Sequence, residues 1–263
     1  MTTQNVTMKM LAFVLMVMTL SSCYEEMWGI RGAGPIVTEE ITLDEFTGID
    51  LVGAFDVKIA YGAEQSVMVE GHHNIIDRLE TGVFDGVWKI KLLPALYRDH
   101  HLTINITIPY IDEIYLSGSG DIETEGFTGL HDLDVELLGS GRIRGTGTFE
   151  VADHAHFSVT GSGDIDMAIN TTEVYSDIFG SGDIHLNGTS EMVKINIEGS
   201  GNYEGYGMES SKYDVHIVSS GNAYVFAKSA LDASITGSGN VYYKGEPAVN
   251  AKVLGSGNVK SSN

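Results

Sequence analysis

The amino-acid sequence predicts an all-β protein, most of it a parallel β-solenoid of about eight rungs. The first observation is a repeat, because Gly-Ser-Gly occurs seven times and Ser-Ser-Gly once in the same series, with successive starts 18 to 22 residues apart. A nearly fixed period of this length is typical of a solenoid, in which each repeat is one turn stacked on the previous one. The eight copies begin at Gly118, Gly139, Gly161, Gly180, Gly199, Ser219, Gly237 and Gly255.

The second observation is the alternation of apolar and polar residues before these motifs. Of the residues two, four and six positions before the last seven copies, 20 of 21 are apolar when tyrosine is counted, and Ser176 is the exception. The residues between them are mostly polar, as Glu136 and Asn196 illustrate. A period of two residues is that of a half-buried strand.

A shorter strand is predicted after each motif, since Ile122, Ile165 and Val241 occupy equivalent positions one residue past an Asp or Asn. Each repeat therefore comprises a strand, a Gly-Ser-Gly corner, a second strand and a loop. Glycine suits such a corner because it reaches positive φ without a Cβ clash. We expect a right-handed coil, by analogy with other large β-helices.

The residue after each motif forms a column that allows two interpretations. Stacked acids could bind calcium, as in shorter glycine-rich repeats. Half of the column is asparagine, however, and Arg142 interrupts the acids, so we favour a ladder of amides with acids capping the turns. The column is Asp121, Arg142, Asp164, Asp183, Asn202, Asn222, Asn240 and Asn258.

The first 22 residues are predicted to be a lipoprotein signal peptide. Lys9 precedes an apolar run from Met10 to Leu20, which is too short for a membrane-spanning helix of about 20 residues. Leu-Ser-Ser-Cys then resembles a bacterial lipobox, in which Cys23 becomes the lipidated first residue. Cys23 is the only cysteine, so the chain can form no internal disulfide. Residues 23–37 are interpreted as a tether, and the acidic pair that follows Tyr24 resembles a surface-export signal of Bacteroidetes lipoproteins.

The charge of the chain argues against nucleic acid as a partner. The net charge is -21, and residues 23–263 carry -22 because the excluded segment holds only the positive charge of Lys9. Such a surface repels phosphate backbones. The partner that the sequence indicates is instead a membrane, reached through the N-terminal lipid.

Residues 38–117 are rich in predicted strands but lack the repeat, and we expect them to form a head region that caps the solenoid of residues 118–263. Three segments point to a known family: the stretch from Phe46 to Ile90, the segment "ITIPYIDEIYLSGSGDI" that leads into the repeats, and the later "GSGN" copies. In these segments the sequence resembles the autotransporter-adhesin head GIN domain family, DUF2807. The resemblance covers about residues 40 to 259. It implies a β-helical fold and a Bacteroidetes-type lipoprotein, and it supplies no catalytic or ligand residues.

Candidate chemistry is sparse in this sequence. His154 and His156 share a strand face and could ligate zinc together with an acid, but no third ligand is evident. We therefore predict no metal and no cofactor. The repeats are short and regular, which leaves little room for the loop-lined cleft of a polysaccharide-cleaving β-helix, so we predict no enzyme.

Tyrosines are the remaining candidate ligand contacts. Alternation places Tyr115, Tyr175, Tyr224 and Tyr242 on the outer surface, where they could contact a glycan or a protein. The function we predict is that of a non-catalytic, lipid-anchored outer-membrane protein, exposed at the cell surface as an adhesin or scaffold. The alternative is a carbohydrate-binding or carbohydrate-active β-helix.

Overall fold

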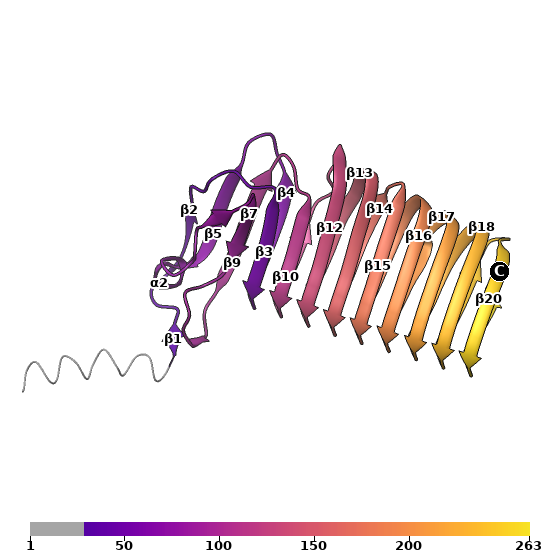
Figure 1. Cartoon of the computed structure of the whole chain (residues 1–263). Coiled ribbons are helices and arrows are strands. Elements are labelled where there is room, and N and C mark those ends of the chain that lie inside the picture. The colour runs from indigo at the N-terminus through magenta and orange to yellow at the C-terminus, as the bar shows by residue number, and fades with distance from the viewer. Residues whose placement is uncertain (1–28) are drawn as a thin grey trace, which may run out of the picture.

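The computed structural model describes residues 29–263, and in this range the chain is a β-solenoid that ends in a mixed sheet (Figure 1). The predicted fold class is thereby confirmed. Each turn of the coil contributes one strand before the Gly-Ser-Gly corner and one after it. We call the two resulting parallel stacks the pre-corner sheet and the post-corner sheet.

The strands of each sheet follow the order of the turns. The pre-corner sheet contains β7 (Val87–Ile90), β3 (Gly48–Gly53), β10 (Glu113–Gly118), β12 (Leu130–Gly139), the C-terminal part of β13 (Arg142–Gly161), β15 (Glu173–Gly180), the C-terminal parts of β16 (Asp183–Gly199), β17 (Asn202–Ser219) and β18 (Asn222–Gly237), and β20 (Ala248–Gly255). The post-corner sheet contains β9 (Leu102–Ile108), β4 (Asp56–Tyr61), β11 (Asp121–Thr124), the N-terminal part of β13, β14 (Asp164–Asn170), the N-terminal parts of β16, β17 and β18, β19 (Asn240–Lys244) and β21 (Asn258–Ser261).

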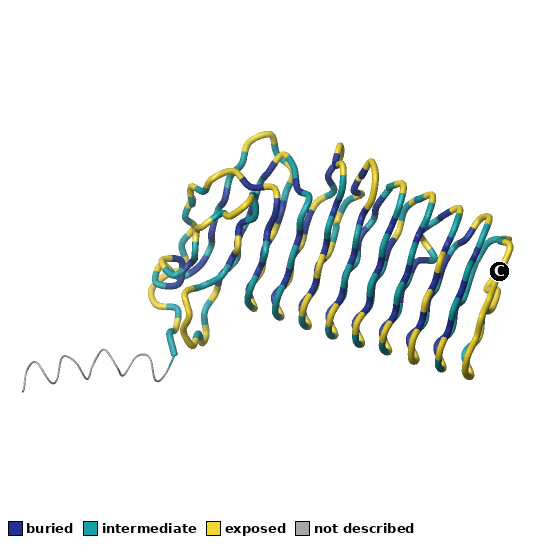
Figure 2. The backbone as a smooth tube through the Cα atoms, viewed as in Figure 1, coloured by how far each residue is buried: buried dark blue, intermediate teal, exposed yellow. Residues whose placement is uncertain are grey.

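The apolar core lies between the two sheets. Strand pairing keeps equivalent repeat positions in register, so that Ile197 pairs with Ile217, which pairs in turn with Ile235. All three side chains are buried, and the residues between the core positions are largely half-buried or exposed (Figure 2). Ser176, the polar exception in the sequence pattern, is buried as well, and its Oγ has no hydrogen-bond partner.

The corners are held by hydrogen bonds between their backbones. The carbonyl of Gly118 accepts hydrogen bonds from the N–H groups of Ser140 (2.9 Å) and Gly141 (3.2 Å) of the next turn, and the same pair of bonds recurs at every later corner. The first glycine adopts positive φ, for example +137° at Gly139. The second admits no side chain, because a Cβ on Gly141 would lie 2.2 Å from the carbonyl oxygen of Gly120.

The column after the corners forms the predicted amide ladder over its C-terminal half. Asp183 Oδ1 accepts hydrogen bonds from the backbone N–H (2.7 Å) and the side-chain amide (3.0 Å) of Asn202. Asn202 and Asn222 repeat the pattern toward the next turn, and the side-chain amide of Asn258 donates to Asn240 at 3.4 Å. Each Asn side chain therefore donates a hydrogen bond to the side chain of the preceding turn, so that successive turns are joined along the column.

The head region extends both parallel sheets and then adds antiparallel strands. Its strands β7, β9, β3 and β4 belong to the two parallel sheets. Antiparallel pairing begins beyond β9, where β5 (Ser66–His72) pairs with β9 and β2 (Ile36–Glu40) pairs with β5. The remaining elements are α2 (His73–Ile76), β6 (Val83–Phe84), β1 (Ile30–Arg31) and β8 (Tyr97–Arg98). The backbone of β9 is thereby paired on both sides.

At the opposite end, the turn formed by β20 and β21 is largely exposed (Figure 2). Val249 and Val253, which the alternation places toward the core, retain 41% and 37% exposure because only the preceding turn packs against them. In the part of the chain that the structure describes, no helix is long and apolar enough to cross a membrane.

Two adjacent residues of β17 test the alternation. Ile217→Ala should lower the free energy of unfolding by about 2–5 kcal/mol, because it leaves a cavity in a fully buried column. His216→Ala, on the exposed side of the same strand, should change it by less than about 0.5 kcal/mol. Urea denaturation followed by circular dichroism measures both, and equal effects would contradict the strand assignment.

Ser219 tests the conformation of the corner. It is the only copy with a side chain at the first corner position, and its φ is +103°. Ser219→Gly should stabilise the protein by about 1 kcal/mol, because relief of backbone strain exceeds the entropy cost of glycine. Ser220→Gly, one residue later, relieves no such strain and should not stabilise. A higher urea midpoint for Ser220→Gly than for Ser219→Gly would refute this account of the corner.

Candidate functional site

The four tyrosines predicted as ligand contacts are divided between the two sheets. Tyr115 lies on β10 and Tyr175 on β15, both in the pre-corner sheet. Tyr224 lies on the post-corner part of β18, and Tyr242 lies on β19. All four are half-buried on the outer surface. The structure therefore brings only Tyr224 and Tyr242 together; Tyr115 and Tyr175 share a sheet but are separated by β12 and β13, so the four do not form one site.

Both tyrosines of the pre-corner sheet use their hydroxyl groups within the protein. Tyr115 donates to Asp134 Oδ2 at 3.0 Å, and partial burial together with the nearby Asp134 charge raises the pKa of the phenol, which stays protonated. Tyr175 donates to Glu173 at 2.6 Å, and Lys194 Nζ lies 4.6 Å from the centre of its ring. These side chains are consequently fixed in orientation.

The tyrosines of the post-corner sheet form an aromatic ladder. The rings of Tyr224 and Tyr242 stack with their centres 5.1 Å apart and an interplanar angle of 12°. Tyr206 meets Tyr224 edge-on at 5.5 Å, and Lys244 lies over the Tyr206 ring. Sequence reasoning missed Tyr206, because Glu204 occupies the repeat position that Tyr224 and Tyr242 share, and Tyr206 lies two residues later, where the pairing of β17 with β18 is irregular.

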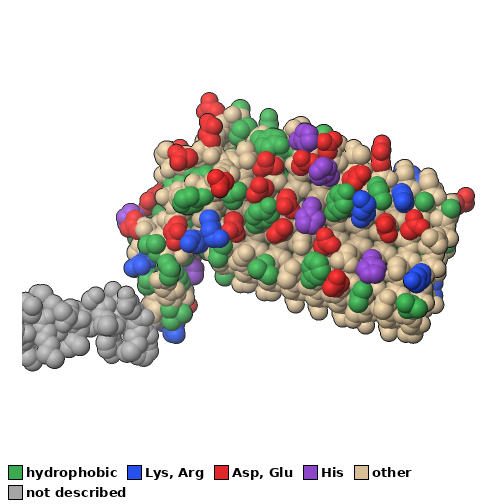
Figure 3. Space-filling view, in the orientation of Figure 1, with side chains coloured by type: hydrophobic (Ala, Val, Ile, Leu, Met, Phe, Trp, Pro, Cys, Tyr) green, Lys and Arg blue, Asp and Glu red, His purple; other side chains and the backbone are tan. Residues whose placement is uncertain are grey.

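Carboxylates and histidines alternate on the outer surface of the pre-corner sheet, and Figure 3 shows histidines among acids on this face of the rungs. His156 is the centre of this network. Its Nδ1 lies 2.9 Å from Asp134 Oδ1, in register on β12, and its Nε2 lies 3.2 Å from Asp177 Oδ2 on β15. Hydrogen bonds from the imidazole to these two carboxylates raise the pKa of His156 to about 10. The imidazolium therefore ties three turns together at neutral pH.

His154 and His156, which the sequence suggested as a zinc-binding pair, have different carboxylate partners. His154 Nε2 lies 3.1 Å from Asp132 Oδ1, whereas His156 is held by Asp134 and Asp177. Although they are only two positions apart on β13, the two imidazoles therefore belong to different, neighbouring ion-pair clusters.

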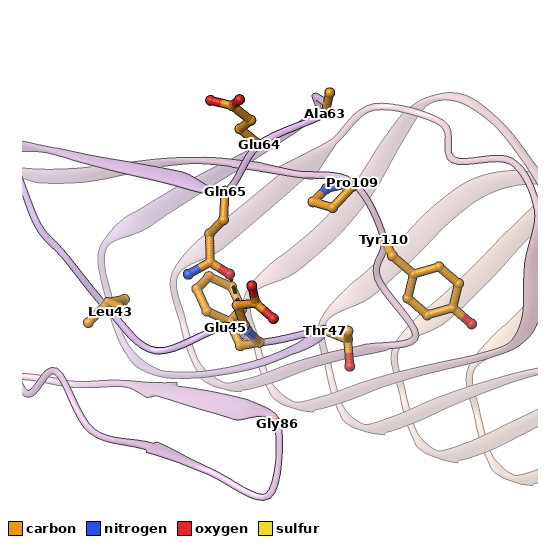
Figure 4. Close-up of a pocket in the computed structure, with 10 residues that line it drawn as sticks. Leu43, Glu45, Thr47, Ala63, Glu64, Gln65, Gly86, Pro109 and Tyr110 are labelled. Carbon is orange, nitrogen blue, oxygen red and sulfur yellow. Dashed lines mark hydrogen bonds between the residues drawn. The ribbon is translucent and has the colours of Figure 1, made fainter.

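A hollow in the head region has a volume of about 710 Å³ (Figure 4). Segments distant in sequence line it, among them Glu45, Glu64, Pro109 and Tyr110. Gln65 braces its wall by accepting a hydrogen bond from the backbone of Phe46 and donating one to the carbonyl of Asp44. No lysine, arginine or histidine lines the hollow, so its chemistry suits a neutral or cationic ligand.

The predicted lipidation site, Cys23, and the signal peptide of residues 1–22 lie outside the described residues. The described residues begin near β1 at the head end of the solenoid, and β20 and β21 lie at the far end (Figure 1).

The raised pKa of His156 predicts a dependence of stability on pH. The contribution is complete below the pKa of an unfolded histidine, about 6.5. It is lost as pH rises through the folded value of about 10. Since 36% of the side chain is exposed, solvent screening limits the effect to about 1 kcal/mol. Chemical denaturation in EDTA between pH 6 and 10.5 should show the parent losing its advantage over His156→Gln. Parallel curves for the two proteins would contradict the ion-pair network.

Several solved structures share the fold of this chain. A crystal structure named as a putative lipid binding protein from Parabacteroides distasonis ATCC 8503 is 26% identical, with a TM-score of 0.84 over 89% of this chain and 99% of that one. A putative adhesin from Parabacteroides merdae ATCC 43184 is 22% identical, with a TM-score of 0.84 and the same coverage. A putative adhesin from Bacteroides fragilis NCTC 9343 is 21% identical, with a TM-score of 0.63 over 89% and 100%.

No curated protein matches the sequence. A family match, in contrast, covers most of the solenoid and the head region, from residue 45 to residue 247. The same range contains the histidine–carboxylate network, the four tyrosines and all residues that line the head hollow except Leu43. The chain belongs to the DUF2807 family, described as "Putative auto-transporter adhesin, head GIN domain".

Proposed function

We propose that this protein is a non-catalytic, lipid-anchored protein of the outer membrane that acts at the cell surface as an adhesin or scaffold. The observation that carries the proposal is the pair of long, continuous outer sheet surfaces, whose polar side chains are fixed to one another from turn to turn. Such surfaces present many groups in a constant arrangement, which favours binding of an extended partner. Family membership and the adhesin-named structural relatives support the same function.

The length of the coil would hold its outer sheet surfaces at a distance from a membrane. The pre-corner sheet stacks ten strands from β7 to β20, which corresponds to about 40 Å along the coil axis. A lipid on Cys23 would attach the chain on the side of the head region, since β1, the first described strand, lies there. The free end of the rod would then point away from the bilayer.

Carbohydrate binding is the second candidate, and the head hollow favours it. Sugar sites combine aromatic surface with hydrogen-bonding groups, and Tyr110, Gln65 and Glu45 offer both. The aromatic ladder is a weaker candidate for sugar stacking, because Tyr224 and Tyr242 direct ring faces toward each other. One relative is named a putative lipid binding protein, but the two glutamates of the hollow in this chain would repel an anionic headgroup.

The anchor is tested by Cys23→Ala. The variant should not incorporate labelled palmitate and should leave the outer-membrane fraction, because no other cysteine can carry the lipid. Cys23→Ser serves as a near-isosteric control and should behave identically. Labelling of either variant, or its continued fractionation with the outer membrane, would exclude lipidation at Cys23.

The binding function is tested by altering one surface at a time. Soluble Cys23→Ala protein is applied to a glycan array and to envelope and host proteins, and its ligands are compared with those of Tyr175→Ala/Lys194→Ala and Tyr224→Ala/Tyr242→Ala. We expect a ligand that the parent binds and that one surface variant loses by tenfold or more, while the other variant keeps it. Release of new reducing ends from a bound polysaccharide would contradict the non-catalytic function and favour the carbohydrate-active alternative. The absence of any ligand would contradict adhesion.

A further inference from the structure

Four metal-ligating side chains meet on the outer surface where β12 begins and β13 bends into the pre-corner sheet. His131 and Asp132 come from β12, and Asp153 and His154 come from the neighbouring turn in β13. None of its residues lines the head hollow, and none is one of the four tyrosines. The proposed adhesin function makes no use of it.

A change of register creates the cluster. Leu130 pairs with Val151, but Asp132 pairs with His154, so that β13 carries one more residue than β12 across this step. A bulge of this kind interrupts the alternation of side chains. As a result, His131 and Asp132 are both outside the core although they are adjacent in sequence. Regular strands would have directed them to opposite faces.

The distances suit coordination of one ion. His131 Nε2 lies 3.2 Å from Asp153 Oδ2, and His131 Nδ1 lies 2.8 Å from Asp132 Oδ2. One ligand atom from each of these three residues lies within 4.8 Å of the other two. In a tetrahedral zinc site with bonds of about 2.0–2.1 Å, ligand atoms are about 3.3 Å apart. The two nitrogens of His131 point to opposite sides of its ring, so only one of them can bind the ion, and the carboxylate that faces the other nitrogen would have to turn toward the ion.

The fourth residue, His154, contacts the carboxylate of Asp132 from the other side. Its Nε2 lies 3.1 Å from Asp132 Oδ1, an atom that is closed to solvent and accepts no hydrogen bond of regular geometry. An imidazole in this position can orient a metal-bound carboxylate. The nitrogen ligand itself comes from His131, and an imidazole ligand favours transition metals over calcium or magnesium.

Charge and access are also favourable. With neutral imidazoles, the two carboxylates give the cluster a charge of about -2, which a divalent cation neutralises. The side chains are between 47% and 69% exposed, so an ion can enter without opening the fold. The strongly acidic chain raises the local concentration of cations.

We propose that His131, Asp132 and Asp153 bind a divalent transition-metal ion, zinc or a metal of similar preference, and that His154 is a positioning residue for Asp132. The neighbouring group of Asp134, Glu136 and His156 has a similar composition. His156 is less exposed than His131, at 36% against 69%, and one of the two carboxylates that it bridges, Asp177, lies outside the group, so an ion there would also have to displace Asp177.

The test measures zinc binding by the full chain carrying Cys23→Ala, which removes the thiol as a competing ligand. Competition with a chromophoric chelator should give one tight site per chain. His131→Asn/Asp153→Asn should remove that site, and His154→Asn should weaken it by about 10–100-fold, as loss of a residue that supports a ligand does. His216→Asn, an exposed histidine on β17, is the matched control and should bind zinc as the parent does.

Cobalt provides the second measurement, because its visible absorption reports coordination geometry directly. The parent and His216→Asn should develop the strong bands of a tetrahedral nitrogen–oxygen site, and His131→Asn/Asp153→Asn should not. Circular dichroism confirms that the variants are folded, which is expected because all the substituted side chains are exposed. Equal zinc affinity in all variants would overturn the proposal and leave the cluster as exposed ion pairs only. So would loss of the site in His216→Asn.

Discussion

The structure depends on the backbone contact between successive corners. At each turn the carbonyl of the first corner position accepts hydrogen bonds from two N–H groups of the following corner. Successive turns therefore lie within hydrogen-bonding distance of each other where the coil bends. A Cβ at the second glycine would fall 2.0–2.4 Å from a carbonyl oxygen of the preceding turn at corner after corner. This contact fixes the relative position of neighbouring turns, and the strands on either side inherit their register from it. The apolar columns and the amide ladder then align as a consequence.

The same alignment explains the chemistry of the outer surface. When every turn is in register, an outward side chain has a fixed neighbour about 4.8 Å above and below it. Like charges stacked in this way would repel each other, so other groups lie between the acids of this acidic chain. His156, for example, lies between Asp134 and Asp177. Aromatic rings stack for the same geometric reason. A regular coil thus converts a short sequence repeat into long rows of fixed side chains, which is the property that an adhesin or scaffold needs.

The sequence predicted the solenoid because its two signals, a repeated glycine corner and a period of two residues, are local and recur many times. It also predicted the amide ladder and the outward position of the four tyrosines. What it could not predict depends on departures from the repeat. His131 meets Asp153 where a β-bulge shifts the register, and Tyr206 joins the aromatic ladder from a position two residues beyond the one that Tyr224 and Tyr242 share. The sequence did not predict the head hollow either, because the loops that line it share no periodic pattern.

The central claim, that corner-to-corner backbone contact sets the fold, is tested most directly at one corner in the middle of the coil. In Gly201→Ala the new methyl group would lie 2.0 Å from the carbonyl oxygen of Gly182, whereas Ser200→Ala, one residue earlier, changes only an exposed side chain. Urea denaturation of the two variants gives the comparison. The account predicts that Gly201→Ala lowers the free energy of unfolding far beyond the roughly 0.5 kcal/mol of an ordinary surface change, with Ser200→Ala within that limit. Equal stability of the two variants would contradict it.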